Sequence, residues 1–186
     1  ICIIQADYLQ LIKKKILKKI SHKTILERVV ENVRGCKKIN KIIIATSIEK
    51  SDDETTELCK KLNVSYYRGD LKNVAKRFFD ILNIYKTNYF IRINADSPLI
   101  DSKLIDLILS KKNNKYDIVT NVIERSFPKG QSVEIFNSNI FKKNFRKIHL
   151  KYDKENVTSY FYKNSSKFKI LNIKNKVDFS SINLSV

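Results

Sequence analysis

The chain has 186 residues, of which 42% are hydrophobic and 30% charged, with a formal net charge of +18. This size and composition predict one globular domain and argue against a disordered chain. No uncharged apolar run approaches the roughly 18 residues of a membrane span, and no signal peptide is visible, so we expect a cytoplasmic protein. The sequence starts at Ile1 without Met and stops at Val186 in an apolar run, so we expect both ends to be trimmed.

The cysteines and the basic residues narrow the function classes. Cys2, Cys36 and Cys59 are odd in number and form no Cys-x-x-Cys pair, which predicts reduced, buried thiols rather than a zinc site. Of the 37 basic residues only 7 are Arg, and the lysines are scattered along the chain. Phosphate-binding surfaces favour Arg for its bidentate geometry, so a solvated basic surface is the preferred interpretation and a nucleic-acid binder the alternative.

Apolar patterns predict an alternating order of strands and helices in the first 120 residues. This part of the chain reads as strand 1–4, helix 24–35, strand 41–46, a helix opened by Ser51, strand 64–67, helix 71–85, strand 88–93, a helix capped by Asp101, and strand 116–121. Such alternation predicts an α/β fold, with a mostly parallel sheet and helices on both faces.

The remaining elements follow a turn at residues 128–130. They are strand 132–136, helices 138–148 and 153–163, and strand 168–173, and we expect a small antiparallel extension of the sheet here. Two Thr/Ser-x-x-Glu signatures predict capping boxes, at Thr24 with Glu27 and at Ser51 with Glu54. The whole chain, residues 1–186, reads as a single domain.

Two segments follow strands in a way that is typical of ligand sites. Ligands of α/β sheets bind outside the carboxyl ends of the strands. Asp96 follows strand 88–93, and the stretch from Gln5 to Lys15 follows strand 1–4.

Six segments in order resemble a known enzyme family over essentially the whole chain. They read "IIQA…KKILKKISHKTILERVVENV", "IIIATS…DD…ELCKKLNV", "YRGDLKNVAKRF", "IRINADSPLID", "VTNV…FPKGQSVEIF" and "ENVTSYFYKN". They resemble cytidylyltransferases that activate acidic sugars, including spore-coat polysaccharide cytidylyltransferase-like proteins, acylneuraminate cytidylyltransferases and CMP-KDO synthetases. The resemblance implies a Rossmann-like nucleotidyltransferase fold and CMP transfer from CTP to a sugar, with Mg²⁺ as cofactor and release of pyrophosphate. It also implies a homodimer in surface polysaccharide biosynthesis.

The resemblance assigns catalytic roles to Asp96 and Lys15. Asp96 matches the family's Gly-Asp-x-Pro aspartate, with Ala95 in place of Gly, and would bind Mg²⁺; a loop Asp capping nearby amides is the alternative. Lys15 matches the lysine that closes the family's phosphate loop, and an exposed basic run is the alternative. The loop departs from the family pattern, because Asp7 stands where the family has Arg and its Gly, Ser, second Arg and Pro are missing.

The resemblance also divides the other candidate residues between two substrates. Those for the nucleotide, with Lys15, are Gln5, Ala6, Ala45, Thr46, Ser47, Arg68 and Arg77. Those for the sugar are Lys129, Gln131, Glu134, Glu155 and Asn156. For Arg77 a surface helix position is the equal alternative, for Glu134 a surface-facing strand position, and for residues 45–47 a plain strand terminus.

Three readings compete with an active cytidylyltransferase. A degenerate homologue without chemistry would explain the altered loop. A nucleotide-sugar glycosyltransferase would use residues 94–96, "NAD", in place of an Asp-x-Asp motif. A nucleic-acid binder would use the net positive charge, and its binding would vanish near physiological salt if it were nonspecific.

Overall fold

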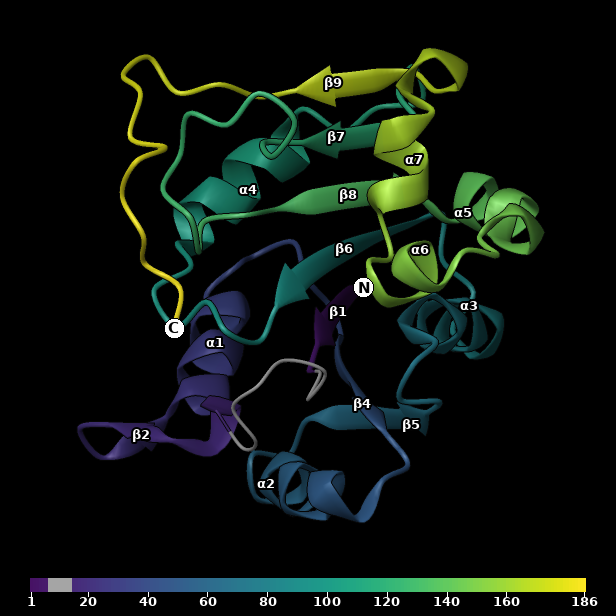
Figure 1. The fold of residues 1–186 in the computed structure, drawn as a ribbon. Coiled ribbons are helices and arrows are strands. Elements are labelled where there is room, and N and C mark those ends of the chain that lie inside the picture. The colour runs from purple at the N-terminus through teal and green to yellow at the C-terminus, as the bar shows by residue number, and fades with distance from the viewer. Residues whose placement is uncertain (7–14) are drawn as a thin grey trace.

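A seven-stranded sheet organises the protein, whose computed structural model describes residues 1–6 and 15–186 (Figure 1). The strand order is β5-β4-β1-β6-β8-β7-β9. The strands are β1 (Cys2–Gln5), β4 (Ile42–Ser47), β5 (Ser65–Gly69), β6 (Tyr89–Asn94), β7 (Ile118–Thr120), β8 (Glu134–Asn137) and β9 (Ile170–Asn172). All seven strands predicted from the sequence are therefore confirmed.

The sheet is mostly parallel, as predicted. β1 pairs in parallel with β4 and β6, β4 with β5, and β7 with β9. β8 runs antiparallel to both of its neighbours, β6 and β7, and forms the antiparallel part of the sheet. A separate hairpin of β2 (Lys19–Ile20) and β3 (Lys23–Thr24) was not predicted, because its two-residue strands carry no apolar alternation.

Helices cover both faces of the sheet. They are α1 (Ile25–Arg34), α2 (Asp53–Lys61), α3 (Val74–Ile84), α4 (Ser102–Ser110), α5 (Ser138–Asn144), α6 (Lys151–Glu155) and α7 (Ser159–Lys163). The described residues also form four 3-10 turns, η1 (Lys15–Leu17), η2 (Lys50–Asp52), η3 (Phe145–Lys147) and η4 (Ser165–Lys167). The described helices are all too short or too polar to cross a membrane.

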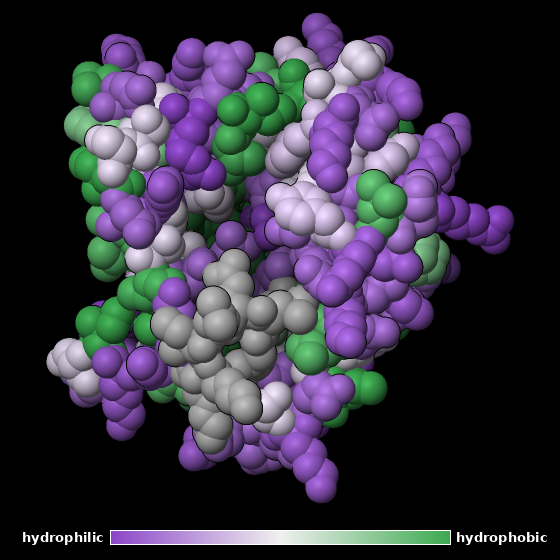
Figure 2. Space-filling model, in the orientation of Figure 1, coloured by the Kyte–Doolittle hydropathy of each residue, from purple (hydrophilic) through white to green (hydrophobic). Residues whose placement is uncertain are grey.

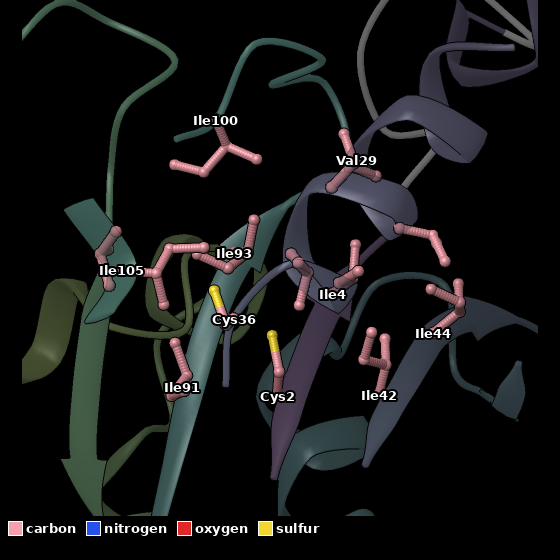
Figure 3. Close-up of a cluster of buried hydrophobic side chains, with 14 of the residues drawn as sticks. Cys2, Ile4, Val29, Cys36, Ile42, Ile44, Ile91, Ile93, Ile100 and Ile105 are labelled. Atoms are coloured by element: carbon pink, nitrogen blue, oxygen red, sulfur yellow. The ribbon is translucent and has the colours of Figure 1, made fainter. Parts of the chain in front are cut away.

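The two faces of the sheet bury separate apolar clusters. Ile4 of β1 packs with α1 and α4 on one face (Figure 3), and Ile3 packs with α3 and the Phe-rich helices α5 and α7 on the other. This split follows from the alternation of side chains along a strand. The three cysteines are free and buried, as predicted, and burial raises the pKa of the Cys59 thiol to about 12.

One predicted capping box forms and the other does not. The Glu27 amide donates to the Thr24 hydroxyl (3.1 Å), and the Thr24 amide donates to the Glu27 carboxylate (3.2 Å). The Ser51 signature is wrong, since residues 50–52 form η2 and Asp52 precedes α2. The Asp52 carboxylate instead accepts from the Thr46 hydroxyl and the Ser47 amide, both at 2.7 Å. This contact ties the start of α2 to the end of β4.

The single helix predicted over residues 153–163 is wrong, because the chain breaks between α6 and α7. Asp153 at α6 is buried and accepts hydrogen bonds from the hydroxyl of Ser159 and, at 2.8 Å, from Lys163 Nζ. These contacts close the turn between the two short helices. Burial opposes ionisation, but the Lys163 and Ser159 hydrogen bonds outweigh it and lower the pKa of Asp153.

We expect Asp153→Asn to destabilise the protein by about 1–2 kcal/mol at neutral pH, because it removes a charge-assisted hydrogen bond from a half-exposed lysine. The folded pKa of Asp153 is lowered, so its contribution is present above the unfolded pKa, about 3.9, and is lost as the pH falls through the folded pKa. Denaturant unfolding from pH 7 to pH 3 measures this, with Glu155→Gln on the same helix as control. A difference that stays constant over this range would contradict the assignment.

Candidate functional site

Three strand ends meet at one edge of the sheet. Gln5 at the end of β1 lies in register with Ala45 of β4 and with Asn94 of β6. The Ala6 amide donates to the Ala45 carbonyl, and the Ala95 amide donates to the Gln5 carbonyl, both at 3.0 Å. The nucleotide candidates at the ends of β1 and β4 are therefore neighbours of the loop that begins with Asp96.

Asp96 presents a partly exposed carboxylate at this edge. Among the described residues, the Ser97 hydroxyl donates to Asp96 Oδ1 at 3.1 Å, and the Val186 amide donates to the Asp96 carbonyl at 3.0 Å. Residues 1–6 and 15–186 contain no group of three His, Cys, Asp or Glu side chains that could enclose a metal. One hard carboxylate still fits Mg²⁺, which commonly takes one or two protein carboxylates and completes its shell with phosphate and water.

Lys15 lies at the same edge as Asp96. It begins η1, which packs against α1, and the Ile25 amide donates to the Lys18 carbonyl at 3.0 Å. Because α1 connects back to the amino end of β4, its first residue lies at the carboxyl edge of the sheet. Asp7 and the rest of the altered loop, residues 7–14, lie outside the described residues.

Arg77 is fully buried, so the surface alternative for it is wrong. Its side chain has 0% exposure, and its Nη1 donates to the Ala45 carbonyl at 3.1 Å. Gly69 makes room for it, because a Cβ at Gly69 would lie 2.7 Å from Arg77 Cγ. A cation therefore approaches the end of β4 from α3.

Arg68 binds the connection after β4. Its Nε donates to the Ser47 carbonyl and its Nη2 to the Glu49 carbonyl, both at 2.9 Å. Its Nη2 also lies 2.8 Å from a carboxylate oxygen of Asp53. These contacts hold the loop that follows Thr46 and Ser47, and a direct contact of Arg68 with a nucleotide stays a prediction.

The turn at Lys129 and Gln131 is linked to the loop after Asp96. Gln131 is buried, donates to the Leu99 carbonyl at 2.5 Å and accepts from the Asp101 amide at 3.0 Å. The Lys129 amide donates to the Ile182 carbonyl at 2.9 Å. The structure thus brings this turn, as well as the C-terminal segment, to the Asp96 side of the sheet.

Glu134 is buried, so the surface-facing alternative for it is wrong. Its carboxylate forms an ion pair with Arg92 of β6 and accepts from the Tyr162 hydroxyl at 2.5 Å. Glu155 and Asn156 lie apart from it, at the end of α6, which packs against α3 and α7. The described contacts of Asn156 are with Tyr152 and Ser159, and they do not bring these two candidates to Asp96.

Two residues of this region were missed in the sequence, Arg92 and Tyr162. Arg92 Nε donates to Gln5 Oε1 at 2.8 Å, so the side chains of Gln5, Arg92, Glu134 and Tyr162 form a continuous polar chain. Burial, followed by the adjacent Glu134 carboxylate, raises the pKa of Tyr162 well above its ordinary value. The available signal was a charged residue between Ile91 and Ile93 in an otherwise apolar strand.

The surface is hollowed near the ends of β1 and β6. Figure 2 shows this depression near the centre of the view, with both hydrophilic and hydrophobic residues in its deeper part. A second hollow, of about 310 Å³, is lined by Cys59, Lys60, Asn63, Val64, Ser65, Tyr66 and Tyr85. It lies at the amino end of β5, away from the strand ends that carry the candidate residues.

We expect Gly69→Ala to displace Arg77, because the new Cβ would overlap Arg77 Cγ in a buried site. Overpacking of this kind costs about 1–3 kcal/mol of stability. Denaturant unfolding measures the loss, and calorimetric titration with CTP should show weaker binding. Gly35→Ala, whose Cβ would meet its nearest atom at 3.1 Å, is the control and should leave CTP binding unchanged. If Gly69→Ala bound CTP with wild-type affinity, the assignment of Arg77 to the nucleotide site would be contradicted.

The fold has relatives among solved structures. A cytidylyltransferase from Leptospira borgpetersenii superposes with a TM-score of 0.94 at 30% identity, covering 100% of this chain and 79% of that one. CMP:2-keto-3-deoxy-manno-octonic acid synthetase, solved with CTP, superposes with a TM-score of 0.71. At 10% identity, over 94% of this chain and 90% of that one, it supports the nucleotidyltransferase fold alone.

Two proteins are similar to this chain in sequence. An uncharacterised protein of Methanocaldococcus jannaschii is 36% identical over 86% of this chain and 65% of its own length. The spore coat polysaccharide biosynthesis protein SpsF of Bacillus subtilis is 26% identical over 68% of this chain and 53% of its own length. The chain thus spans less than two thirds of either relative. The cytidylyltransferase profile matches residues 1–181, and the chain belongs to the cytidylyltransferase family.

Proposed function

We propose that this chain carries out CMP transfer from CTP to a hydroxyl of an acidic sugar, with release of pyrophosphate. The observation that supports this most is the juxtaposition of the ends of β1, β4 and β6 in a chain that matches the family over residues 1–181. The acidic sugar and a role in surface polysaccharide synthesis are suggested by what the synthetase and SpsF are named for. A cytoplasmic homodimer is part of the same proposal.

The chain's own residues would position the triphosphate. Lys15 approaches from η1, on the edge where Asp96 also lies. A single cation about 4 Å from a phosphate charge contributes roughly 4 kcal/mol at an effective dielectric constant of about 20. Phosphoryl-type transfer depends mainly on such positioning and charge neutralisation. Asp96 would hold Mg²⁺, which when bound neutralises charge on the α-phosphate and the leaving pyrophosphate.

The sugar would lie over β8 and the turn before it. Lys129 supplies a cation there that suits an acidic sugar, and Gln131 fixes the turn against the loop after Asp96. The buried Glu134 supports the proposed sugar site indirectly, through its ion pair with Arg92 and the hydrogen bond that it accepts from Tyr162. Contacts of Glu155 and Asn156 with the sugar remain predictions, because α6 packs against α3 and α7.

Asp96→Asn should lower the rate of pyrophosphate release by about 100-fold or more, because a metal-held charge contributes several kcal/mol to the transition state. The assay contains CTP, Mg²⁺ and a panel of acidic sugars, including 2-keto-3-deoxy-manno-octonic acid and N-acetylneuraminic acid. Asp101→Asn is the matched control. It keeps a helix-capping side chain at the start of α4 and should keep wild-type activity.

Two outcomes would contradict this proposal. Absence of pyrophosphate with every sugar, together with no calorimetric binding of CTP, would favour a degenerate homologue. Hydrolysis of nucleotide sugars with indifference to CTP would favour the glycosyltransferase alternative.

A further inference from the structure

A strongly basic surface lies where the chain turns from α5 through η3 into α6. This stretch, residues 142–152, carries five Lys or Arg side chains and no Asp or Glu, and we call it the basic corner. The Ser138 amide at the start of α5 donates to the Asn88 carbonyl at 2.9 Å, so α5 begins beside the amino end of β6. Figure 1 shows α5 at the outer edge of the molecule. The basic corner thus starts at the end of β6 opposite to Asp96.

The cations of the basic corner are not neutralised by nearby carboxylates. Four of them are solvent-exposed, namely Lys143, Arg146, Lys147 and Lys151. In the described part of the chain, none of these four forms an ion pair with a carboxylate. Lysines on other surfaces do have such partners, as Lys60 has in Glu57 at 2.7 Å and Lys174 in Glu124 at 2.9 Å. The basic corner therefore presents uncompensated positive charge to a partner.

Two large apolar side chains stand among these cations. Leu150 is 53% exposed and Tyr152 is 59% exposed. The chain on either side of them is anchored, because Ile148 and Asp153 are both buried. The Tyr152 ring is also fixed by a cation–π contact, with Lys163 Nζ 4.5 Å from the ring centre. The fold thus holds both apolar side chains in water, and a partner with an apolar layer would bury them favourably.

We propose that the basic corner docks the protein on a lipid bilayer with anionic head groups, as a surface contact and not as a membrane span. Each Lys or Arg close to such a surface raises the affinity about fivefold. Leu150 and Tyr152 enter the layer between the head groups and the acyl chains, which favours such side chains. A nucleic acid offers phosphates but no hydrocarbon layer for Leu150, and only one of the five cations is Arg. Docking here goes beyond the proposed function and does not depend on it.

Cosedimentation with lipid vesicles at about 0.1 M salt tests the role of the charges. The wild-type protein should bind phosphatidylcholine vesicles that contain phosphatidylglycerol, and should bind pure phosphatidylcholine vesicles far more weakly. A quadruple variant without the exposed cations should bind the anionic vesicles about 100-fold more weakly. Its substitutions are Lys143→Gln, Arg146→Gln, Lys147→Gln and Lys151→Gln.

A control variant loses the same charge on the other side of the sheet. Its four exposed lysines lie near the carboxyl ends of α1 and α4, which pack on the face opposite to α5. The substitutions are Lys37→Gln, Lys38→Gln, Lys111→Gln and Lys115→Gln. This variant should bind anionic vesicles as the wild type does, because salt screens charges more than about 10 Å from the bilayer. Circular dichroism confirms that both variants are folded.

A tryptophan reporter distinguishes a bilayer from a phosphate surface. The chain contains no Trp, so Leu150→Trp introduces a single indole. Its emission should shift to shorter wavelength with anionic vesicles, because indole partitions into the bilayer interface. Inorganic phosphate and duplex DNA should cause no such shift. Ile48→Trp is the control, since Ile48 is 63% exposed just after β4, at the other end of the sheet, and its emission should not shift with vesicles.

Several results would overturn docking by the basic corner. These are equal binding to anionic and neutral vesicles, wild-type affinity in the folded quadruple variant, or unshifted emission from Leu150→Trp on sedimented vesicles. Binding of duplex DNA that the quadruple variant loses, without binding to vesicles, would assign this surface to a nucleic acid instead. Failure to bind CTP or to release pyrophosphate would refute the proposed function alone, because vesicle binding is measured without nucleotide.

Discussion

The parallel pairing of β1 with both β4 and β6 is the constraint on which the site depends. It aligns Gln5 with Ala45 and Asn94, so that the loops after three strands begin side by side. A slip of one residue in β1 would exchange the two faces, burying Gln5 among the residues that now surround Ile4. The apolar residues on both faces of β1 prevent this slip, and so the two hydrophobic clusters also fix the position of the polar residues at the strand ends.

The polar chain of Gln5, Arg92, Glu134 and Tyr162 contains a charged pair that is largely removed from water. Removing Arg92 and Glu134 from water is costly, and such a pair is weak support for stability even when it is fully bonded. Every step of the chain from Gln5 to Tyr162 is nonetheless satisfied by a neighbour. Arg92 contacts both Gln5, on a strand assigned to the nucleotide, and Glu134, on the strand assigned to the sugar.

The sequence predicted the secondary-structure elements well, but it predicted the burial and contacts of single side chains poorly. Apolar runs located all seven strands, and a local signature located the Thr24 cap, because both depend on residues close in sequence. The break between α6 and α7 was missed, since Asp153 closes it through contacts made only after folding. Arg77 and Glu134 were ambiguous because their burial depends on neighbouring strands and on the space left by Gly69. The resemblance assigned roles to residues at the ends of β1, β4 and β6, which are neighbours in the sheet, but the link through Arg92 needed the sheet order.

The central claim is that a nucleoside triphosphate binds at this edge, between Asp96 and Lys15. A crystal structure of the protein with CTP and Mn²⁺ tests this most directly, because the anomalous signal of manganese locates the metal without ambiguity. The account predicts a manganese peak within bonding distance of an Asp96 carboxylate oxygen, with the triphosphate extending toward Lys15 and the base near Gln5. Nucleotide bound in the hollow beside Tyr66 and Tyr85, with no metal at Asp96, would contradict it.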